Sequence, residues 1–237
     1  MPVTLHRMVQ DAAMRRPDGD AVRCDGERLV WSELARRSNG VARALLDTGV
    51  GRGDRVAVLL GKSLKVPVAF YGVLAAGAAL VPIDPKSPPS QIERIMRATG
   101  VTRIVTEPER TRSVVKLATS CPELSHVLGI EGLDGPSPSV MPWSAVDNMA
   151  SDEPPEVEVG GLDTSYIQHT SGSTGEPKLI RHTPASALAL VERAVDEYGL
   201  TADDRLSNHS SHHTCFATFD YYAAARAAAT TVILTPA

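Results

Sequence analysis

The residues best suited to chemistry form one short segment, Thr170 to Lys178, which reads Thr-Ser-Gly-Ser-Thr-Gly-Glu-Pro-Lys. Seven of its nine residues are Thr, Ser, Gly or Lys. Glycines allow tight turns that expose backbone N–H groups, and hydroxyl side chains add further donors. Lys178 adds a fixed positive charge. A segment of this kind directly after a short β-prone run predicts a cradle for a polyphosphate.

Two better-known loop motifs do not fit this segment. In a Walker A loop, Gly-x-x-x-x-Gly-Lys-Ser/Thr, the second glycine would fall on Pro177, and Leu179 instead of Ser or Thr follows the lysine. A nucleophile elbow, Gly-x-Ser-x-Gly, fails because Gly172 and Gly175 are too close. The chain also lacks a Gly-x-Gly-x-x-Gly fingerprint, so a dinucleotide-binding fold has no support.

A second group of chemically able side chains comprises His209, His212, His213 and Cys215. Their spacing matches no standard zinc pattern. Two adjacent histidines on a strand also point to opposite faces and do not meet one ion easily. We therefore predict no metal bound by this group.

Composition limits the classes of function. The chain has 237 residues, of which 43% are hydrophobic and 22% charged, enough for one large or two small globular domains. The net charge of −4 excludes a general attraction of the whole surface to nucleic acid or anionic lipid. We expect neither nucleic acid nor a membrane as a partner.

Targeting signals are missing from the sequence. Its three cysteines are scattered, with no Cys-x-x-Cys pair, which favours a reducing compartment. Residues 1–13 lack the apolar core of a signal peptide. The longest apolar run, 66–81, has only 16 residues and is interrupted by Pro67. We predict a soluble, cytoplasmic protein.

Short apolar segments alternate with amphipathic ones along the chain. The expected helices are 5–13, 34–46, 66–76, 90–98, 185–198 and 217–228. The expected strands are 55–60, 79–83, 103–106, 165–169, 205–208 and 230–234, with a hairpin formed by 21–24 and 28–31 around Asp25-Gly26. This alternation predicts an α/β fold with Rossmann-like, doubly wound parallel sheets.

The composition changes between residues 129 and 160. Five prolines lie between Gly132 and Pro155, together with many acidic or small residues. We interpret 129–160 as a long surface connection between two α/β subdomains. The predicted division is therefore 1–160, which includes the connection, and 161–237, which begins a second subdomain and contains the phosphate loop.

Segment 170–178 resembles the phosphate-loop signature of the adenylate-forming enzymes, a superfamily that includes acyl-CoA synthetases, nonribosomal peptide synthetase adenylation domains and luciferases. Three other segments resemble motifs of that family in the same order. They are Leu29-Val-Trp-Ser-Glu-Leu34, Leu74 to Pro85 with its ending Pro-Ile-Asp-Pro, and His212-His213 before Phe219-Asp220. The Pro-Ile-Asp-Pro ending is more typical of amino-acid adenylation domains. The resemblance covers essentially the whole chain.

The resemblance also shows what this sequence lacks. Leu179 stands where the family usually has glycine. Family members are longer, and their adenine, ribose and Mg²⁺ motifs and the C-terminal domain with its catalytic lysine would follow residue 237. The resemblance thus implies the front half of the large N-terminal domain, with the C-terminal domain absent. It also implies that this chain alone is inactive and that a complementing C-terminal chain is one expected partner.

For the site, the resemblance implies that a carboxylate attacks the α-phosphate of ATP and that pyrophosphate leaves. Lys178 and the loop would hold the ATP phosphates, and His213 would orient the carboxylate. The implied phosphate-binding residues are Thr170, Ser171, Gly172, Ser173, Thr174, Gly175 and Lys178. ATP and Mg²⁺ are the implied cofactors, with the Mg²⁺ ligand expected beyond this chain.

The acyl pocket leaves two alignments open. In the ungapped one, Cys215 stands where amino-acid-activating relatives carry the Asp that pairs with the substrate ammonium, and Phe216 and Phe219 line the pocket. In a slipped alignment, Asp220 takes the role of that Asp. A buried ammonium without a partner is costly, so the ungapped alignment implies a substrate without an α-amino group, or an amine bound elsewhere.

Three functions are compatible with these features. The first is the N-terminal part of a ligase that forms acyl- or aminoacyl-AMP from a carboxylic or amino acid and loads a carrier-protein thiol or CoA. The second is a non-catalytic truncated or split half that binds a partner chain. The third is an acyl-CoA synthetase without a carrier protein.

Overall fold

The computed structural model describes residues 4–133, 138–171 and 177–235. Its helices are α1 (Leu5–Arg15), α2 (Trp31–Asp47), α3 (Lys65–Ala75), α4 (Pro89–Thr99), α5 (Thr111–Ser120), α6 (Trp143–Asn148), α7 (Pro184–Tyr198) and α8 (Cys215–Ala227), with a 3₁₀ turn at Pro108–Arg110. Its strands are β1 (Asp20–Cys24), β2 (Glu27–Val30), β3 (Arg55–Val58), β4 (Ala79–Pro82), β5 (Arg103–Val105), β6 (His126–Leu128), β7 (Ser139–Met141), β8 (Tyr166–Ser171), β9 (Pro177–His182), β10 (Arg205–Asn208) and β11 (Thr230–Ile233).

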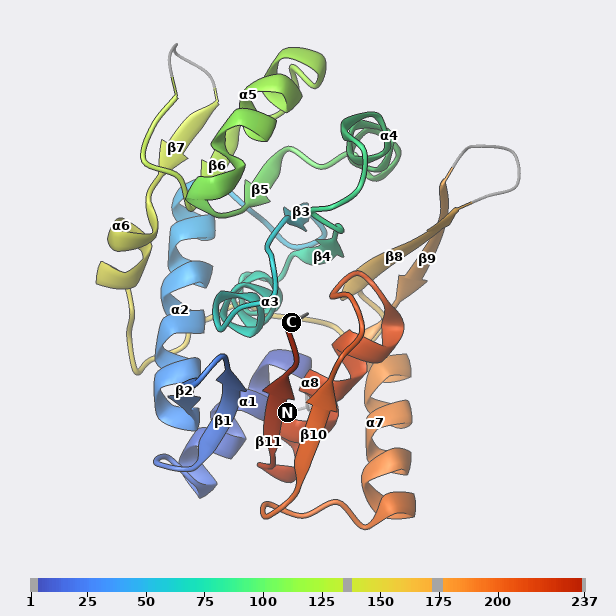
Figure 1. The fold of residues 1–237 in the computed structure, drawn as a ribbon. Coiled ribbons are helices and arrows are strands. Elements are labelled where there is room, and N and C mark those ends of the chain that lie inside the picture. Colours follow the sequence, from blue (N-terminus) through green and yellow to red (C-terminus); the bar gives the residue numbers. More distant parts are fainter. Residues whose placement is uncertain (1–3, 134–137, 172–176, 236–237) are drawn as a thin grey trace.

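The described strands form two sheets (Figure 1). The larger has the order β7-β6-β5-β3-β4-β8-β9 and is parallel except for β9, which runs antiparallel to β8. The smaller has the order β10-β11-β1-β2 and is parallel except for β2. The predicted α/β fold with mostly parallel sheets is confirmed, and so is the hairpin at Asp25-Gly26.

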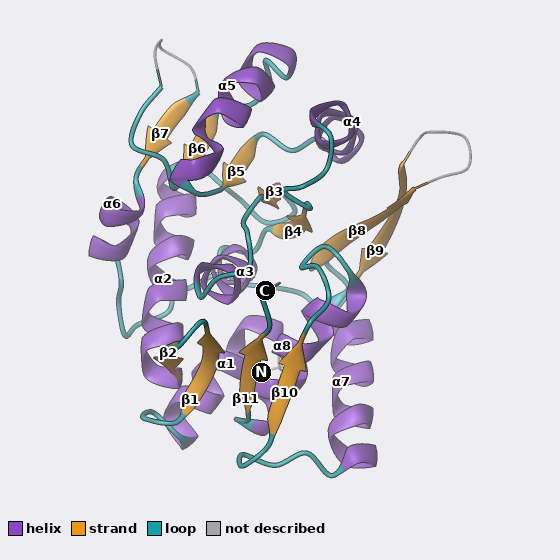
Figure 2. Ribbon diagram, in the orientation of Figure 1, coloured by secondary structure: helices purple, strands orange, loops and turns teal. Residues whose placement is uncertain are grey.

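Helices cover both faces of the larger sheet, as Figure 2 shows. On strand β3, Val56 and Val58 belong to the core shared with α2 and α3. Ala57, and Leu59 directly after the strand, belong to the core shared with α4 and α5. This alternation follows from the two-residue period of a strand. Every residue of α3 from Val66 to Ala75 is buried, because the helix lies between the two sheets (Figure 1).

Helices α2 and α3 approach each other closely. A Cβ atom at Gly72 of α3 would lie 2.5 Å from Cβ of Val41 in α2 and 2.9 Å from the Ser38 carbonyl oxygen. Only glycine fits at this crossing. The apolar run 66–81 corresponds to the buried helix α3 followed by the buried strand β4. In the described part of the chain, no helix is both long and apolar enough to span a bilayer.

The segment 129–160, predicted as a surface connection, is not all loop. The segment contains β7, which extends the larger sheet, and α6. Trp143 is 7% exposed, and its Nε1 donates a hydrogen bond to the Thr106 carbonyl oxygen at 2.7 Å. Pro138 and Pro142 stand directly before β7 and α6, whereas Pro154 and Pro155 lie in the part that follows α6. Beyond α6, residues 149–160 contain neither helix nor strand.

The two sheets exchange strands across the predicted division at residue 160. Strands β8 and β9 complete the larger sheet, whereas β1 and β2 complete the smaller sheet beside β10 and β11. The division into 1–160 and 161–237 stays a prediction. This exchange brings the carboxyl ends of β4 and β8 close to the segment that follows β10.

Candidate active site

The candidate site lies where parallel strands from both sheets end. Asp84 follows β4, His169 lies near the end of β8, and His213 follows β10. Carboxyl ends of parallel strands gather at one edge of a sheet, where ligands of α/β proteins usually bind. These three side chains come together although 129 positions separate Asp84 from His213 along the sequence.

His213 is held from two sides. Its Nδ1 atom lies 3.8 Å from Oδ2 of Asp84, and the two side chains are 25% and 24% exposed. The His169 ring stacks on the His213 ring with centroids 5.7 Å apart and planes 8° from parallel. Burial first, and the neighbouring His213 second, hold the pKa of His169 below its ordinary value. Because a neutral ring does not repel its neighbour, this lowering favours the stack.

His212 points into the core instead. It is 8% exposed, and Nδ1 lies 3.4 Å from the Tyr221 hydroxyl. Burial lowers the pKa of His212 to about 3, and the Lys62 charge adds to that effect. Adjacent histidines therefore have different environments, and only His213 joins the cluster at the strand ends.

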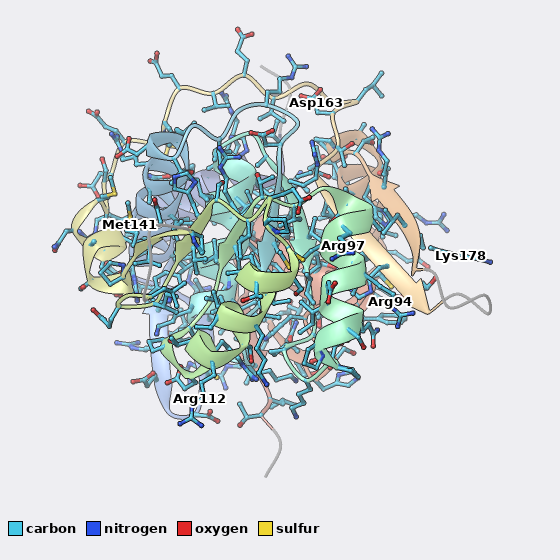
Figure 3. The ribbon with its side chains drawn as sticks, turned by 90° about the horizontal axis from the view of Figure 1, so that it is seen from above. Arg94, Arg97, Arg112, Met141, Asp163 and Lys178 are labelled. Atoms are coloured by element: carbon cyan, nitrogen blue, oxygen red, sulfur yellow. The ribbon has the colours of Figure 1, made fainter. Side chains whose placement is uncertain are left out.

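The predicted phosphate loop connects β8 to β9. Thr170 pairs with Lys178 across this hairpin, and both residues are exposed. Figure 3 shows Lys178 extending away from the body of the protein. The predicted residues Gly172, Ser173, Thr174 and Gly175 lie outside the described residues, and the side chain of Ser171 is likewise not described. The strand before the loop was predicted, whereas its antiparallel return was not.

The four predicted acyl-pocket residues begin helix α8. Thr214 caps the helix through a hydrogen bond from the Ala217 backbone N–H. Cys215 is exposed at the first turn, and Phe216 is 69% exposed. Phe219 is partly buried and packs against the main core. The first turn of α8 thus presents Cys215 and Phe216 to the outside, and the next turn directs Phe219 inward.

Asp220, the alternative amine partner, is engaged within the protein. Its Oδ2 atom accepts a hydrogen bond from Nδ2 of Asn208 at 3.2 Å, and the same Nδ2 donates to the Ala217 carbonyl at 2.9 Å. Burial raises the pKa of Asp220 to about 6. A carboxyl held against a fully buried asparagine is less available to a ligand than Cys215, which is exposed. Both alignments of the acyl pocket stay predictions.

Lys62 links the two sheets at the same edge. Its ammonium donates hydrogen bonds to the carbonyls of His209 and Leu234, both at 2.7 Å, and of Asn208 at 3.4 Å. Burial lowers the pKa of Lys62. These carbonyls lie at the ends of β10 and β11, so the lysine fixes the start of the segment that carries His213.

Sequence reasoning missed Asp84, His169, Asn208 and Lys62. Asp84 and His169 had a usable signal, because each stands at the end of an expected strand of a parallel sheet. Lys62 and Asn208 had none, since their partners are backbone carbonyls and a helix that folding alone brings near. The sequence therefore identified the candidate residues His213 and Lys178, but not the side chains that hold His213 and its segment in place.

The described residues hold no metal cluster, and a wide groove lies elsewhere on the protein. Within 4–133, 138–171 and 177–235, no three His, Cys, Asp or Glu side chains are grouped to hold a metal ion. The Mg²⁺ ligand was expected beyond this chain, and we assign no step to the ion. A wide groove of about 1800 Å³ lies along α1 and residues 149–160, away from the histidine cluster.

Comparisons with known proteins agree with the motifs. The sequence model of the AMP-binding enzyme family matches residues 9–237. Surfactin synthase subunit 1 of Bacillus subtilis is 32% identical over 207 residues, which are 87% of this chain but only 5% of that protein.

Solved structures give the same result. The nonribosomal peptide synthetase FmoA3, bound to α-methyl-L-serine-AMP, superposes with a TM-score of 0.83 and 28% identity over 99% of this chain and 24% of its own. A long-chain-fatty-acid CoA ligase from Rhodopseudomonas palustris, named as putative, has a TM-score of 0.84 over 98% of this chain and 57% of its own. Its identity of 24% supports likeness of fold alone. The family resemblance is thus confirmed, and the chain belongs to the AMP-binding enzyme family.

Proposed function

We propose that the chain is the N-terminal portion of an ATP-dependent ligase that adenylates a carboxylic or amino acid and passes it to a carrier-protein thiol or to CoA. The chain spans only a small part of the synthetase it matches and 24% to 57% of the two solved chains. The activity of a whole enzyme is therefore a proposal for this chain.

One observation supports the proposal most directly. His169 and Thr170 are neighbours on β8, and they connect to opposite sides of the site. His169 stacks on His213, and Thr170 pairs with Lys178 on β9. One strand thus links the residue proposed to orient the acid with the lysine proposed to hold the phosphates. Adenylation requires the carboxylate of the acid and the phosphates of ATP to meet.

The chemistry follows from this arrangement. A carboxylate oxygen attacks the α-phosphorus of ATP, the bond to the bridging oxygen breaks, and pyrophosphate leaves. Lys178 supplies positive charge to the phosphates as a point charge. His213 contacts the carboxylate and limits its orientation. Electrostatic stabilisation of the charge that develops in the transition state is the main contribution expected from such groups.

Carboxylate-dependent exchange of pyrophosphate into ATP tests the proposal. The chain is joined after its last residue to the remainder of an adenylation domain from a relative, and the chimera is assayed with a panel of amino and carboxylic acids. We expect exchange by the chimera and none by the 237-residue chain alone. A folded chimera that exchanges with no acid would contradict the proposal and favour a non-catalytic half that binds a partner.

The acceptor is a separate question. Similarity to surfactin synthase supports a carrier protein, whereas the fold is shared with a CoA ligase. Supplying the active chimera with CoA or with a phosphopantetheinylated carrier protein distinguishes the two acceptors. Thioester formation with CoA alone would favour the acyl-CoA synthetase alternative.

A further inference from the structure

We propose that Asp84 and His169 are positioning residues that fix the ring of His213, with Asp84 selecting the Nδ1–H tautomer. This inference rests on the proposed function, because it assigns how the acid-orienting residue of that site is held. It adds two residues that neither the sequence motifs nor the family comparison assigned.

The carboxylate of Asp84 is itself oriented before it meets the ring. Its Oδ1 atom accepts a hydrogen bond from the backbone N–H of Lys86 at 2.9 Å. Its other oxygen, Oδ2, is the one that lies 3.8 Å from Nδ1 of His213. A short turn after β4 therefore determines which oxygen faces the histidine.

The ring of His213 has only one nitrogen in contact with this carboxylate. Nδ1 is sealed from solvent and has no hydrogen-bond partner within the described residues, although the side chain as a whole is 25% exposed. A carboxylate is an acceptor only, so the nitrogen that faces it is favoured as the N–H donor. Separations in unliganded sites often shorten when substrate binds.

His169 fixes the plane of the same ring. The two rings are 8° from parallel with centroids 5.7 Å apart, within the range of offset aromatic stacking. His169 is positioned in turn by β8, which is hydrogen-bonded between β4 and β9. With one edge facing Asp84 and one face against His169, His213 presents Nε2 as its free nitrogen. That atom accepts a hydrogen bond when the ring is neutral and donates one to a carboxylate when the ring is protonated.

Asp84→Asn gives a sharp test because it should reverse the tautomer of His213 and not merely weaken the preference. The single amide oxygen of asparagine would be used by the Lys86 backbone N–H, which turns the NH₂ group toward His213. That donor requires an acceptor at Nδ1, so the tautomer should reverse to Nε2–H. Asp84→Ala removes both groups and should give the mixture of tautomers found in a free histidine.

The tautomer is read from long-range proton–nitrogen NMR spectra of the 237-residue chain carrying isotope-labelled histidine, at about pH 8.5, where an ordinary imidazole is neutral. The seven histidines are sorted by the signals that disappear in His213→Gln. We expect Nδ1–H in the parent and Nε2–H in Asp84→Asn. Lys86→Ala, whose exposed side chain is removed while its backbone N–H remains, should leave the parent spectrum unchanged.

Two results would overturn the assignment. One is a parent ring that carries its proton on Nε2, and the other is a tautomer that does not respond to Asp84→Asn in a chain with an unchanged melting temperature. His169→Phe should retain the Nδ1–H tautomer, whereas His169→Ala should broaden the His213 signals through ring motion. Unchanged line widths in His169→Ala would remove His169 from the proposal.

The kinetic readout separates this inference from the proposed function. In the chimera, Asp84→Asn should lower kcat/KM for the acid by roughly tenfold while leaving the KM for ATP unchanged, because one oriented contact is lost. A chimera without any exchange would refute the adenylation proposal, yet the tautomer measured in the chain would still decide the positioning of His213.

Discussion

The two sides of strand β8 differ in how their candidate groups are held. On one side His213 is stacked against His169 and faces Asp84, with a quarter of its side chain exposed. On the other side Lys178 extends from strand β9 and is exposed (Figure 3). A histidine that orients a planar carboxylate needs a fixed ring, whereas an ammonium acts as a point charge that its phosphate partner can position on binding. Tertiary contacts accordingly hold the histidine, whereas the lysine side chain is exposed.

Lys178→Ala tests the exposed side and has the largest expected effect. In the active chimera we expect kcat/KM for ATP to fall by roughly 10- to 100-fold, since a charge-assisted contact of ~1.5–3 kcal/mol is lost. The melting temperature should not change, because the side chain is exposed. Lys116→Ala, an exposed lysine on α5, is the matched control and should leave both quantities unchanged. ATP kinetics that match the parent would rule out a phosphate contact by Lys178.

Lys62→Met tests the side of the site that carries His213. Methionine keeps most of the length of lysine but leaves the carbonyls of Asn208, His209 and Leu234 without this donor. We expect the free energy of unfolding in urea to fall by about 1–2 kcal/mol, and amide exchange to accelerate at the ends of β10 and β11. Lys62→Arg should recover part of the loss, because arginine keeps a charged donor. If Lys62→Met is as stable as Lys86→Met, a control at an exposed lysine, the lysine does not fix this edge.

Cys215→Asp tests whether the residue at the start of α8 decides the preference for α-amino acids. A neutral thiol cannot pair with an ammonium, whereas an aspartate can. We expect the chimera to shift its preference among acids severalfold toward α-amino acids, a change of about 1 kcal/mol for a pair that stays partly exposed. The slipped alignment would be favoured instead if the parent prefers an α-amino acid and Asp220→Ala abolishes that preference while Cys215→Ala does not.

The pH dependence of stability tests the environment of Asp220 in α8. Burial raises the pKa of Asp220 from 3.8 to about 6, so the folded state keeps a proton that the unfolded state releases between these values. The stability that this proton contributes is present below about pH 4 and is lost as the pH rises through 6. Asp220→Asn should remove this loss.

Urea unfolding of the parent and of Asp220→Asn at about pH 4 and pH 7 measures the difference. Burial holds the pKa of His6 at about 4 and that of His212 at about 3, so both destabilise the fold as the pH falls below 6.5. These two contributions are common to both proteins and cancel in the comparison. Equal changes in the two proteins would show that Asp220 does not keep its proton.

The predictable parts of the fold are those set by local pattern. The apolar run Arg55 to Leu60 and the Asp25-Gly26 hairpin were placed from the sequence, because strand burial and turn chemistry are encoded in adjacent residues. Strand β9 was missed because Lys178 to Ile180 was interpreted through its loop chemistry. Helix α6 was missed because prolines on both sides of Trp143 resembled a connection, although that tryptophan is buried by a distant contact with Thr106.

The sequence by itself determined the family, the α/β class and the chemical character of Thr170 to Lys178, since motif spacing and residue type carry that information. Only the tertiary structure showed which side chains surround each of the two adjacent histidines. His212 is buried beside Tyr221, and His213 meets Asp84 and His169, because the parallel strands that carry these residues end at one edge. Register across sheets depends on contacts between residues far apart in sequence, and local pattern does not specify them.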